Sequence, residues 1–251
     1  MINSLIKKIL KKTPFYAFYR QLKERRDYPI YQKSYSQCGE DLIMYFLFNW
    51  LKIRRPIYLD IGANHPKFLN NTYFFYKRGC SGILIEPNHN LLEKLRRVRP
   101  RDKCINIGIG FGEKREADFY IMTADTMSTF SKETAEQYAS YGTHKIKEVR
   151  KVLLVPINEI FPELFEKTPN LISLDIEGLD LDILKSINFE IYRPEVFCVE
   201  TLTYSEDNTE KKLGEIIDFM LSQDYFVYAD TYVNTIFVDK RCWEKRKSSI
   251  R

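Results

Sequence analysis

The chain has 251 residues, which is enough for one sizeable hydrophobic core, and no shift in composition marks a second domain of comparable size. Its formal net charge of +5 is modest, and much of the excess lies in the first 26 residues, where eight lysines and arginines face one glutamate. Enzymes that act on nucleic acid usually show a basic face across the whole fold, so this composition excludes a nucleic-acid partner from our expectations.

Residues 1–33 form a predicted N-terminal extension. Its apolar residues recur at helical spacing opposite the lysines, which predicts an amphipathic helix; they are Ile2, Leu5, Ile6, Ile9 and Leu10. This apolar stripe is expected to pack on the rest of the chain or on a second subunit of a homo-oligomer, and the alternative is weak attachment to a membrane surface. Because lysines interrupt the short apolar run, it predicts neither a signal peptide nor a membrane span.

The five cysteines are scattered without the paired spacing of a zinc site, and three of them fall in apolar runs. Buried, reduced thiols are typical of a cytosolic protein. We therefore expect a cytoplasmic protein, at most peripheral at the inner membrane surface.

From residue 56 onward, apolar runs bounded by turn residues alternate with helical patterns. The predicted strands are 57–61, 82–86, 103–107, 117–122, 151–156, 170–175, 195–200, 224–228 and 234–238. The predicted helices are 38–51, 69–78, 88–98, 157–166, 178–187 and 208–222. Repeated alternation of this kind implies right-handed parallel crossovers, so the predicted fold class is α/β, with one domain over residues 34–251.

The segment 123–149 interrupts the alternation because it is long, polar and rich in hydroxyl groups. Inserts of this kind are often lids or substrate loops. His144 and the hydroxyls of Thr126, Ser128 and Thr129 are therefore candidates for substrate contact, although a solvated loop is the default expectation.

Two acidic residues follow successive predicted strands. In open α/β sheets, ligands bind beyond the carboxyl ends of the strands, where Asp60 would face the ligand and Gly62 would let the backbone approach it. Glu86 ends the next strand, where a carboxylate can accept both hydroxyl protons of a ribose. Asn106, at the end of the third strand, offers an amide to an adenine edge.

The glycine pattern decides which cofactor carries that ribose. A pyrophosphate needs the GxGxxG pattern at a helix N-terminus, whereas no second glycine follows Gly62 closely. S-adenosylmethionine (SAM) carries a carboxylate and an ammonium group but no phosphate. The sequence therefore favours SAM over NAD.

Several segments together resemble the FkbM-type methyltransferases over roughly residues 34–240. They are YSQCGEDLIMYFLF from Tyr35, YLDIGANHPKFLNNTYFFYKRGCSGILIEPN from Tyr58, RPRDKCINIGIG from Arg99, MSTF from Met127, SLDIEGLDLDIL from Ser173 and FCVET from Phe197. The resemblance implies a Rossmann-like class I methyltransferase fold with a mostly parallel seven-stranded sheet of order 3-2-1-4-5-7-6. It also implies methylation of a hydroxyl oxygen, commonly of a sugar or a polyketide.

The same resemblance maps residues to the cofactor pocket. These are Asp60, Gly62, Asn64, Glu86 and Asn106. Gln37 and Glu40, in the SQxGED segment, would lie across the mouth of the pocket.

Methyl transfer to an alcohol needs in-line approach of the oxygen and removal of its proton. Asp175 and Glu200 are the stronger candidates for the base, because an ionised carboxylate that ends an apolar strand needs a partner. Glu177 could instead satisfy a helix N-terminus, and His65 could cap the following helix. A site rich in carboxylates would also favour Mg²⁺ bound by Asp175 and Glu200.

The predicted function is SAM-dependent O-methylation of a sugar, nucleotide-sugar or glycan precursor, with a small-molecule or saccharide acceptor as the partner. An NAD-dependent oxidoreductase is the first alternative. A non-catalytic subunit that binds SAM and positions partners through residues 1–33 is the second.

Overall fold

A computed structural model describes residue 16 and residues 32–112, 115–176, 178–203 and 209–248. The chain separates into two compact units, Met1–Lys33 and Ser34–Arg251. The amphipathic helix expected near the N-terminus lies outside the described residues.

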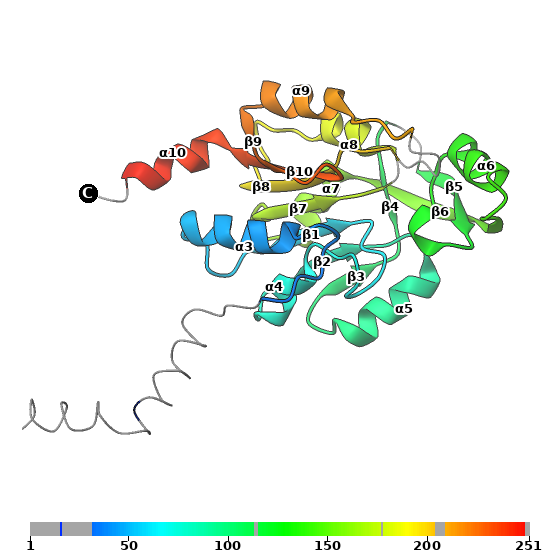
Figure 1. Cartoon of the computed structure of the whole chain (residues 1–251), viewed down its shortest axis with the longest axis horizontal. Coiled ribbons are helices and arrows are strands. Elements are labelled where there is room, and N and C mark those ends of the chain that lie inside the picture. Colours follow the sequence, from blue (N-terminus) through cyan, green and yellow to red (C-terminus); the bar gives the residue numbers. More distant parts are fainter. Residues whose placement is uncertain (1–15, 17–31, 113–114, 177, 204–208, 249–251) are drawn as a thin grey trace, which may run out of the picture. The chain divides into compact units, whose positions relative to one another are not determined.

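The second unit is built on a seven-stranded sheet (Figure 1). Its strands are β1 (Tyr58–Ile61), β2 (Gly82–Ile85), β3 (Lys103–Ile105), β7 (Leu171–Leu174), β8 (Val196–Glu200), β9 (Tyr225–Asp230) and β10 (Asn234–Asp239). They follow the order β3-β2-β1-β7-β8-β10-β9, in which only β10 pairs antiparallel with its neighbours. When only the strands of this sheet are counted along the chain, the order is 3-2-1-4-5-7-6, as the resemblance implies.

Helices cover both faces of the sheet, as a mostly parallel α/β fold requires. They are α3 (Glu40–Trp50), α4 (Tyr73–Lys77), α5 (His89–Val98), α7 (Ile157–Leu164), α8 (Asp180–Ser186), α9 (Gly214–Ser222) and α10 (Lys240–Ser248). Alternate residues of β1 enter different cores: Leu59 and Ile61 pack with α7, α8 and α9, whereas Tyr58 packs with α3, α4 and α5. The α/β class is therefore confirmed.

A second, three-stranded sheet consists of β4 (Gly108–Gly110), β5 (Glu116–Met122) and β6 (Ile146–Pro156), in the order β4-β6-β5. The segment 123–149, which we expected to be a long loop, contains the 3₁₀ helix η1 (Asp125–Met127), α6 (Lys132–Ser140) and the start of β6. Ser131 caps α6 by accepting a hydrogen bond from the backbone N–H of Thr134. The buried side chains of Ala135 and Tyr138 then pack α6 against η1 and β5.

Other element boundaries also differ from the sequence-based predictions. The helix expected over 69–78 begins only at Tyr73, because the side chain of Asn70 accepts hydrogen bonds from the backbone N–H groups of Thr72 and Tyr73. The helix expected over 208–222 begins at Gly214, and β4 and α10 were not predicted. In the part of the chain that the structure describes, none of the helices has the length and apolar character of a membrane span.

Candidate active site

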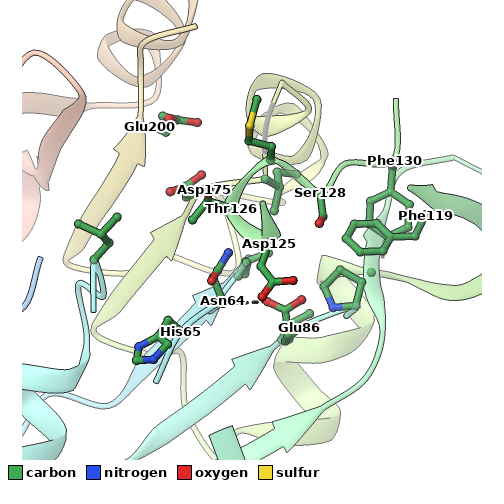
Figure 2. Close-up of a pocket in the computed structure, with 18 of the residues that line it drawn as sticks. Asn64, His65, Glu86, Phe119, Asp125, Thr126, Ser128, Phe130, Asp175 and Glu200 are labelled. Atoms are coloured by element: carbon green, nitrogen blue, oxygen red, sulfur yellow. Dashed lines mark hydrogen bonds between the residues drawn. The ribbon is translucent and has the colours of Figure 1, made fainter. Parts of the chain in front are cut away.

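A cavity of about 250 Å³ opens at the carboxyl ends of β1, β2, β7 and β8 (Figure 2). Strand-end residues line one side of the cavity, and the η1 segment between β5 and α6 lines the other. The cavity is therefore at the place in the fold where open parallel sheets bind ligands.

Gly62 makes the tight turn after β1. Its φ is +80°, and a Cβ atom there would lie 1.9 Å from the backbone oxygen of Asp175. The backbone N–H groups of Gly62 and Ala63 both donate to the carbonyl of Ile85 on β2, at 3.0 and 3.2 Å. Glycine is therefore needed first for the close approach of the β1 and β7 ends, and this turn also forms part of the cavity wall.

Glu86 follows the last residue of β2, and its buried carboxylate lines the cavity. Oε2 accepts a hydrogen bond from the backbone N–H of Asn64 at 2.8 Å, and Oε1 accepts one from Asn88 at 2.7 Å. Burial raises the pKa of Glu86 to about 7; the two backbone hydrogen bonds oppose that rise, whereas the negative charge of Asp125 adds to it. Each carboxylate oxygen retains a lone pair that can accept a further hydrogen bond from a ligand hydroxyl.

Asp60 lies in a buried network of polar side chains. Its buried carboxylate accepts hydrogen bonds from Thr72 Oγ1 at 2.6 Å and Asn70 Nδ2 at 3.2 Å, and Oδ2 lies 3.9 Å from Nη1 of Arg99. Burial raises the pKa of Asp60, and the positive charge of Arg99 opposes this. Asp60 is not among the residues that line the cavity, and its predicted contact with the cofactor stays a prediction.

Arg99 is the centre of this buried network. Its side chain is fully buried, and Nε donates to Asp102 at 2.7 Å, while Nη2 donates to Tyr58 and Thr72. The network joins β1 to the segment that leads into α4, and it is a structural element behind the cavity wall.

Two further predicted pocket residues also have structural partners. Glu40 accepts hydrogen bonds from Thr231 and Asn234, which tie the start of α3 to the hairpin of β9 and β10. Asn106 donates through its side chain to the carbonyls of Glu86 and Pro87, both at 2.8 Å. Neither Glu40 nor Asn106 lines the cavity, whereas Gln37 and Asn64 do.

Asp175 and Glu200 meet at the far end of the cavity from Glu86 (Figure 2). They come from β7 and β8, which are parallel neighbours, so the two carboxyl groups lie at adjacent strand ends. Burial raises the pKa of Asp175, and the neighbouring Glu200 side chain opposes the rise. A buried carboxyl group with a raised pKa, beside a second carboxyl group, is suited to accept and release a proton.

Glu177 lies outside the described residues. The loop that carries it is held by Asp180, whose buried carboxylate accepts from the backbone N–H groups of Ile176 and Gly178, both at 3.3 Å. Burial, together with the charge of Asp175, raises the pKa of Asp180 to about 7. Sequence reasoning missed this ordering role, although Asp180 opens a helix, where an acidic side chain commonly binds backbone N–H groups.

His65 lines the cavity, but its hydrogen bonds argue against a role as the base. Nδ1 accepts from the backbone N–H groups of Phe68 at 2.9 Å and Lys67 at 3.2 Å. A neutral imidazole that accepts at Nδ1 carries its proton on Nε2. Burial and the charges of Lys94 and Lys67 lower the pKa of His65, which favours this neutral form. His65 is therefore a hydrogen-bond donor to a ligand.

The η1 segment supplies the opposite wall. Asp125, Thr126 and Ser128 line the cavity, as does the ring of Phe130. Thr129 instead pairs with the backbone of Tyr120, and His144 is not part of the lining. Sequence reasoning missed Asp125, because a polar residue in an insert carries no periodic signal.

The described residues contain no group of three or more histidine, cysteine or acidic side chains placed to hold a metal ion. Asp175 and Glu200 together offer two carboxylates. Mg²⁺ is often held by one or two protein carboxylates together with water and substrate oxygens, so the magnesium prediction depends on the acceptor as well as on this pair.

The chain is similar in fold to two solved structures. One is a putative caffeoyl-CoA O-methyltransferase from Staphylococcus aureus, 10% identical, with a TM-score of 0.44 over 94% of this chain and 98% of that one. The other is an O-methyltransferase from Bacillus cereus in complex with SAH, 9% identical, with a TM-score of 0.43 over 94% and 98%. No curated protein matches the chain.

A family model described as the methyltransferase FkbM domain matches residues 60–227, which is more than half of the chain. The match spans β1 to β9 and so includes the strand ends that form the cavity. The chain therefore belongs to the FkbM family of S-adenosylmethionine-dependent methyltransferases.

Proposed function

We propose that the protein transfers a methyl group from SAM to a hydroxyl oxygen of a sugar, nucleotide-sugar or glycan precursor. The observation that carries this proposal is the division of one cavity: Glu86 stands at one end, and the carboxyl pair of Asp175 and Glu200 stands at the other. The first end suits a ribose, and the second suits removal of a hydroxyl proton.

The cofactor end is defined by contacts that distinguish a nucleoside. The two oxygens of Glu86 are held by backbone N–H groups and can accept from two vicinal ribose hydroxyls. Beyond Glu86 the lining is apolar and suits the faces of an adenine ring; it comprises Ile107, Ile109, Phe119 and Phe130. The turn from Gly62 to Asn64 would contact the amino-acid part of SAM.

SAM, when bound, supplies an electrophilic methyl group whose transfer breaks a carbon–sulfur bond and forms a carbon–oxygen bond. Asp175 and Glu200 accept the proton that the acceptor hydroxyl loses as that bond forms. The raised pKa of Asp175 makes it a stronger base than an exposed carboxylate. His65 donates through Nε2 and helps to orient the acceptor.

The sugar class is supported by the rim of the cavity. The ring of Phe68 is 66% exposed, although it lines the cavity, and it packs edge-on against His65 with 6.3 Å between ring centroids. Thr126 and Ser128, which carry hydroxyl groups, line the same cavity. An exposed aromatic ring beside hydroxyl and carboxyl groups suits a polyol, which has an apolar C–H face and a polar edge.

Mg²⁺ is proposed as an auxiliary ion. Asp175 and Glu200 would bind it together with acceptor hydroxyls, whose pKa the ion would lower. This route uses the same two carboxylates as direct proton transfer, and a chelator distinguishes the two.

We also propose a cytoplasmic location and no nucleic-acid partner. The five cysteines are free in the structure, which suits a reducing compartment. The basic residues within 1–33 would give weak attachment to a membrane surface, or their apolar neighbours would pack in a homo-oligomer.

The test has two steps. Calorimetry with SAM, S-adenosylhomocysteine and NADH should show binding of the first two ligands and not of the third. Transfer of isotope-labelled methyl from SAM should then be measured on a panel of nucleotide sugars, free sugars and simple polyols. Binding of NADH in place of SAM would refute the cofactor assignment, and SAM binding without transfer to any hydroxyl acceptor would refute the O-methyl chemistry.

A further inference from the structure

The helix α3 has an unusual distribution of polar and apolar side chains. Its two acidic residues, Glu40 and Asp41, are buried, whereas Phe46 and Trp50 are 55% and 51% exposed. Because these aromatic residues are four positions apart, they lie on the same face of the helix. A helix that is apolar all round is normally covered on every side, and no described residue of this chain covers the outer face of α3 to that extent.

The exposed aromatic surface continues from α3 onto α10. Trp50 stacks on Trp243, with 6.4 Å between centroids and 11° between ring planes, and the ring of Phe46 lies 5.8 Å from that of Trp50. Trp243 is fixed from beneath by edge contacts with Phe226 and Tyr228 on β9. The three aromatic residues therefore form one surface with a rigid base.

Cationic side chains surround this aromatic surface. The guanidinium group of Arg246 lies 3.2 Å from the ring centroid of Trp243 and 5.1 Å from that of Trp50. The sequence of α10 carries five basic residues against one acidic residue, and two of the five, Lys240 and Arg241, pair with Asp224 at 4.0 and 3.7 Å. Arg54 and Arg55, which follow Trp50 by four and five positions and are exposed, add two positive charges to the chain just after α3. We name Phe46, Trp50, Trp243 and Arg246 the aromatic–cationic face.

We propose that the aromatic–cationic face docks on an anionic lipid surface. Aromatic side chains with an apolar body and a polar edge favour the boundary between lipid headgroups and acyl chains, and tryptophan is the strongest example. Arginine and lysine beside them complement the negative charge of the lipid headgroups.

Charge argues against two other partners for this face, a second copy of this chain and the chain's own N-terminal residues. A second copy of this chain would bring the same cations opposite one another, and the first 26 residues carry eight basic residues against one acidic residue. Like charges placed face to face oppose association. An anionic surface is attracted by both the aromatic–cationic face and the N-terminal residues.

The position of the face is compatible with catalysis at the membrane. In Figure 1, α3 and α10 lie at the end of the domain opposite β5 and α6, which flank the cavity-lining η1 segment. Docking through α3 and α10 would therefore leave the cavity open to the acceptor.

The chain offers a direct reporter, because its only two tryptophans, Trp50 and Trp243, are both in this face. Tryptophan emission of the full-length protein should be recorded with vesicles of phosphatidylglycerol and phosphatidylcholine, and with vesicles of phosphatidylcholine alone. A shift to shorter wavelength, and quenching by brominated acyl chains, are expected only with the anionic vesicles. Binding through residues 1–33 alone would not produce these signals, since that segment contains no tryptophan. Trp243→Phe leaves Trp50 as the single reporter.

Variants separate the aromatic and cationic contributions. Phe46→Ser and the pair Arg54→Glu and Arg55→Glu should each lower partition onto the anionic vesicles by about fivefold or more. Ile191→Ser, at an apolar side chain that is 65% exposed elsewhere, and the pair Arg97→Glu and Lys103→Glu, at exposed basic residues of α5 and β3, are the matched controls and should not change it. Affinity for S-adenosylhomocysteine should be unchanged in every variant, which verifies the fold.

Three results would overturn the proposal. The first is unchanged tryptophan emission while the protein sediments with the vesicles, which would assign binding to residues 1–33 alone. The second is an emission shift that follows protein concentration without vesicles, which would assign the face to a second copy. The third is a shift produced by a short oligonucleotide and not by anionic vesicles.

Discussion

Asp60 and Glu86 occupy comparable places in the sequence, near the ends of neighbouring parallel strands, yet the fold uses them differently. Asp60 is the third residue of the four-residue strand β1, and the alternation of side chains turns it to the same face as Tyr58, where Arg99 lies. Glu86 stands one position beyond β2, where the chain leaves the sheet, and its carboxylate lines the cavity.

On the three strands that supply acidic residues to the cavity, the carboxylate follows the last residue of the strand or ends it, whereas Asp60 lies inside β1. Asp175 obeys the same rule, since it follows the last residue of β7, and Glu200 is the last residue of β8. Of these four acidic residues at or near strand ends, Asp60 stabilises the scaffold, and Glu86, Asp175 and Glu200 line the cavity.

The largest effect is expected at the carboxyl pair. Asp175→Asn and Glu200→Gln should each lower kcat by about 10²–10⁴-fold while preserving SAM affinity, because proton removal and not cofactor binding is lost. Steady-state kinetics on an accepted hydroxyl substrate, together with calorimetry on SAM, measures both quantities. Asp118→Asn, at an exposed carboxylate of β5, is the control and should behave as the parent.

A chelator decides between the two routes for that proton. An enzyme assisted by Mg²⁺ loses activity on chelation and regains it with added Mg²⁺. If the proton is transferred directly to the carboxylates, the chelator should leave the activity unchanged. Parent-like turnover by both amide variants would refute the catalytic placement of Asp175 and Glu200.

The buried network behind the cavity is expected to dominate stability. Arg99→Met leaves Asp60 and Asp102 buried without their cation, so the free energy of unfolding should fall by about 3–5 kcal/mol. Arg115→Met removes the exposed ion pair with Glu159, where both side chains are more than half exposed, and should cost less than about 1 kcal/mol. Urea unfolding of the two variants compares them directly, and equal losses would show that the Arg99 network is not what holds β1 to α4.

The sequence predicted the sheet well because its central strands are continuous apolar runs with turn residues at both ends. It did not predict β4, whose two glycines in three residues lack any strand signal, or α10, whose highly charged sequence has no apolar stripe. The long strand β6 was predicted only in part, because its first half alternates exposed charges with half-buried side chains.

Site residues could be predicted from the sequence where they follow the end of a strand. They could not be predicted where a contact with a residue distant in the sequence fixes the position of the side chain. The position of Glu86 could be read from the strand end. The burial of Asp60 against Arg99 depends on a contact between residues 39 positions apart, and local pattern gives no sign of it. Asp125 and Ser128 reach the cavity only because η1 and α6 fold the insert back, which is likewise a tertiary effect.

The comparison between Asp60 and Glu86 can be tested on cofactor affinity. Glu86→Ala should weaken SAM binding by about 1.5–3 kcal/mol, which is typical of a hydrogen bond to a charged group, and the fold should survive. Asp60→Asn should change SAM affinity less, since its side chain does not line the cavity. Calorimetry on both variants gives the answer, and a larger loss at Asp60 than at Glu86 would reverse the assignment.

The smallest expected effect is a pH dependence that belongs to Glu86. Because burial raises its pKa to about 7 and ribose hydroxyls bind the ionised carboxylate, SAM affinity should rise with pH through 7 and be about tenfold weaker at pH 6 than on the plateau above pH 8.

The stability of the ligand-free protein should change in the opposite direction. A buried carboxyl group whose pKa is raised favours the protonated folded state, so its contribution to stability is lost as pH rises from the ordinary glutamate pKa of 4.5 towards 7. Asp180 has a raised pKa in the same range, so the difference between the parent and Glu86→Gln isolates the Glu86 part. If Glu86→Gln keeps the full pH dependence of SAM affinity, the titrating group is not Glu86. The assignment of Glu86 to the ribose-binding end of the cavity would then be wrong.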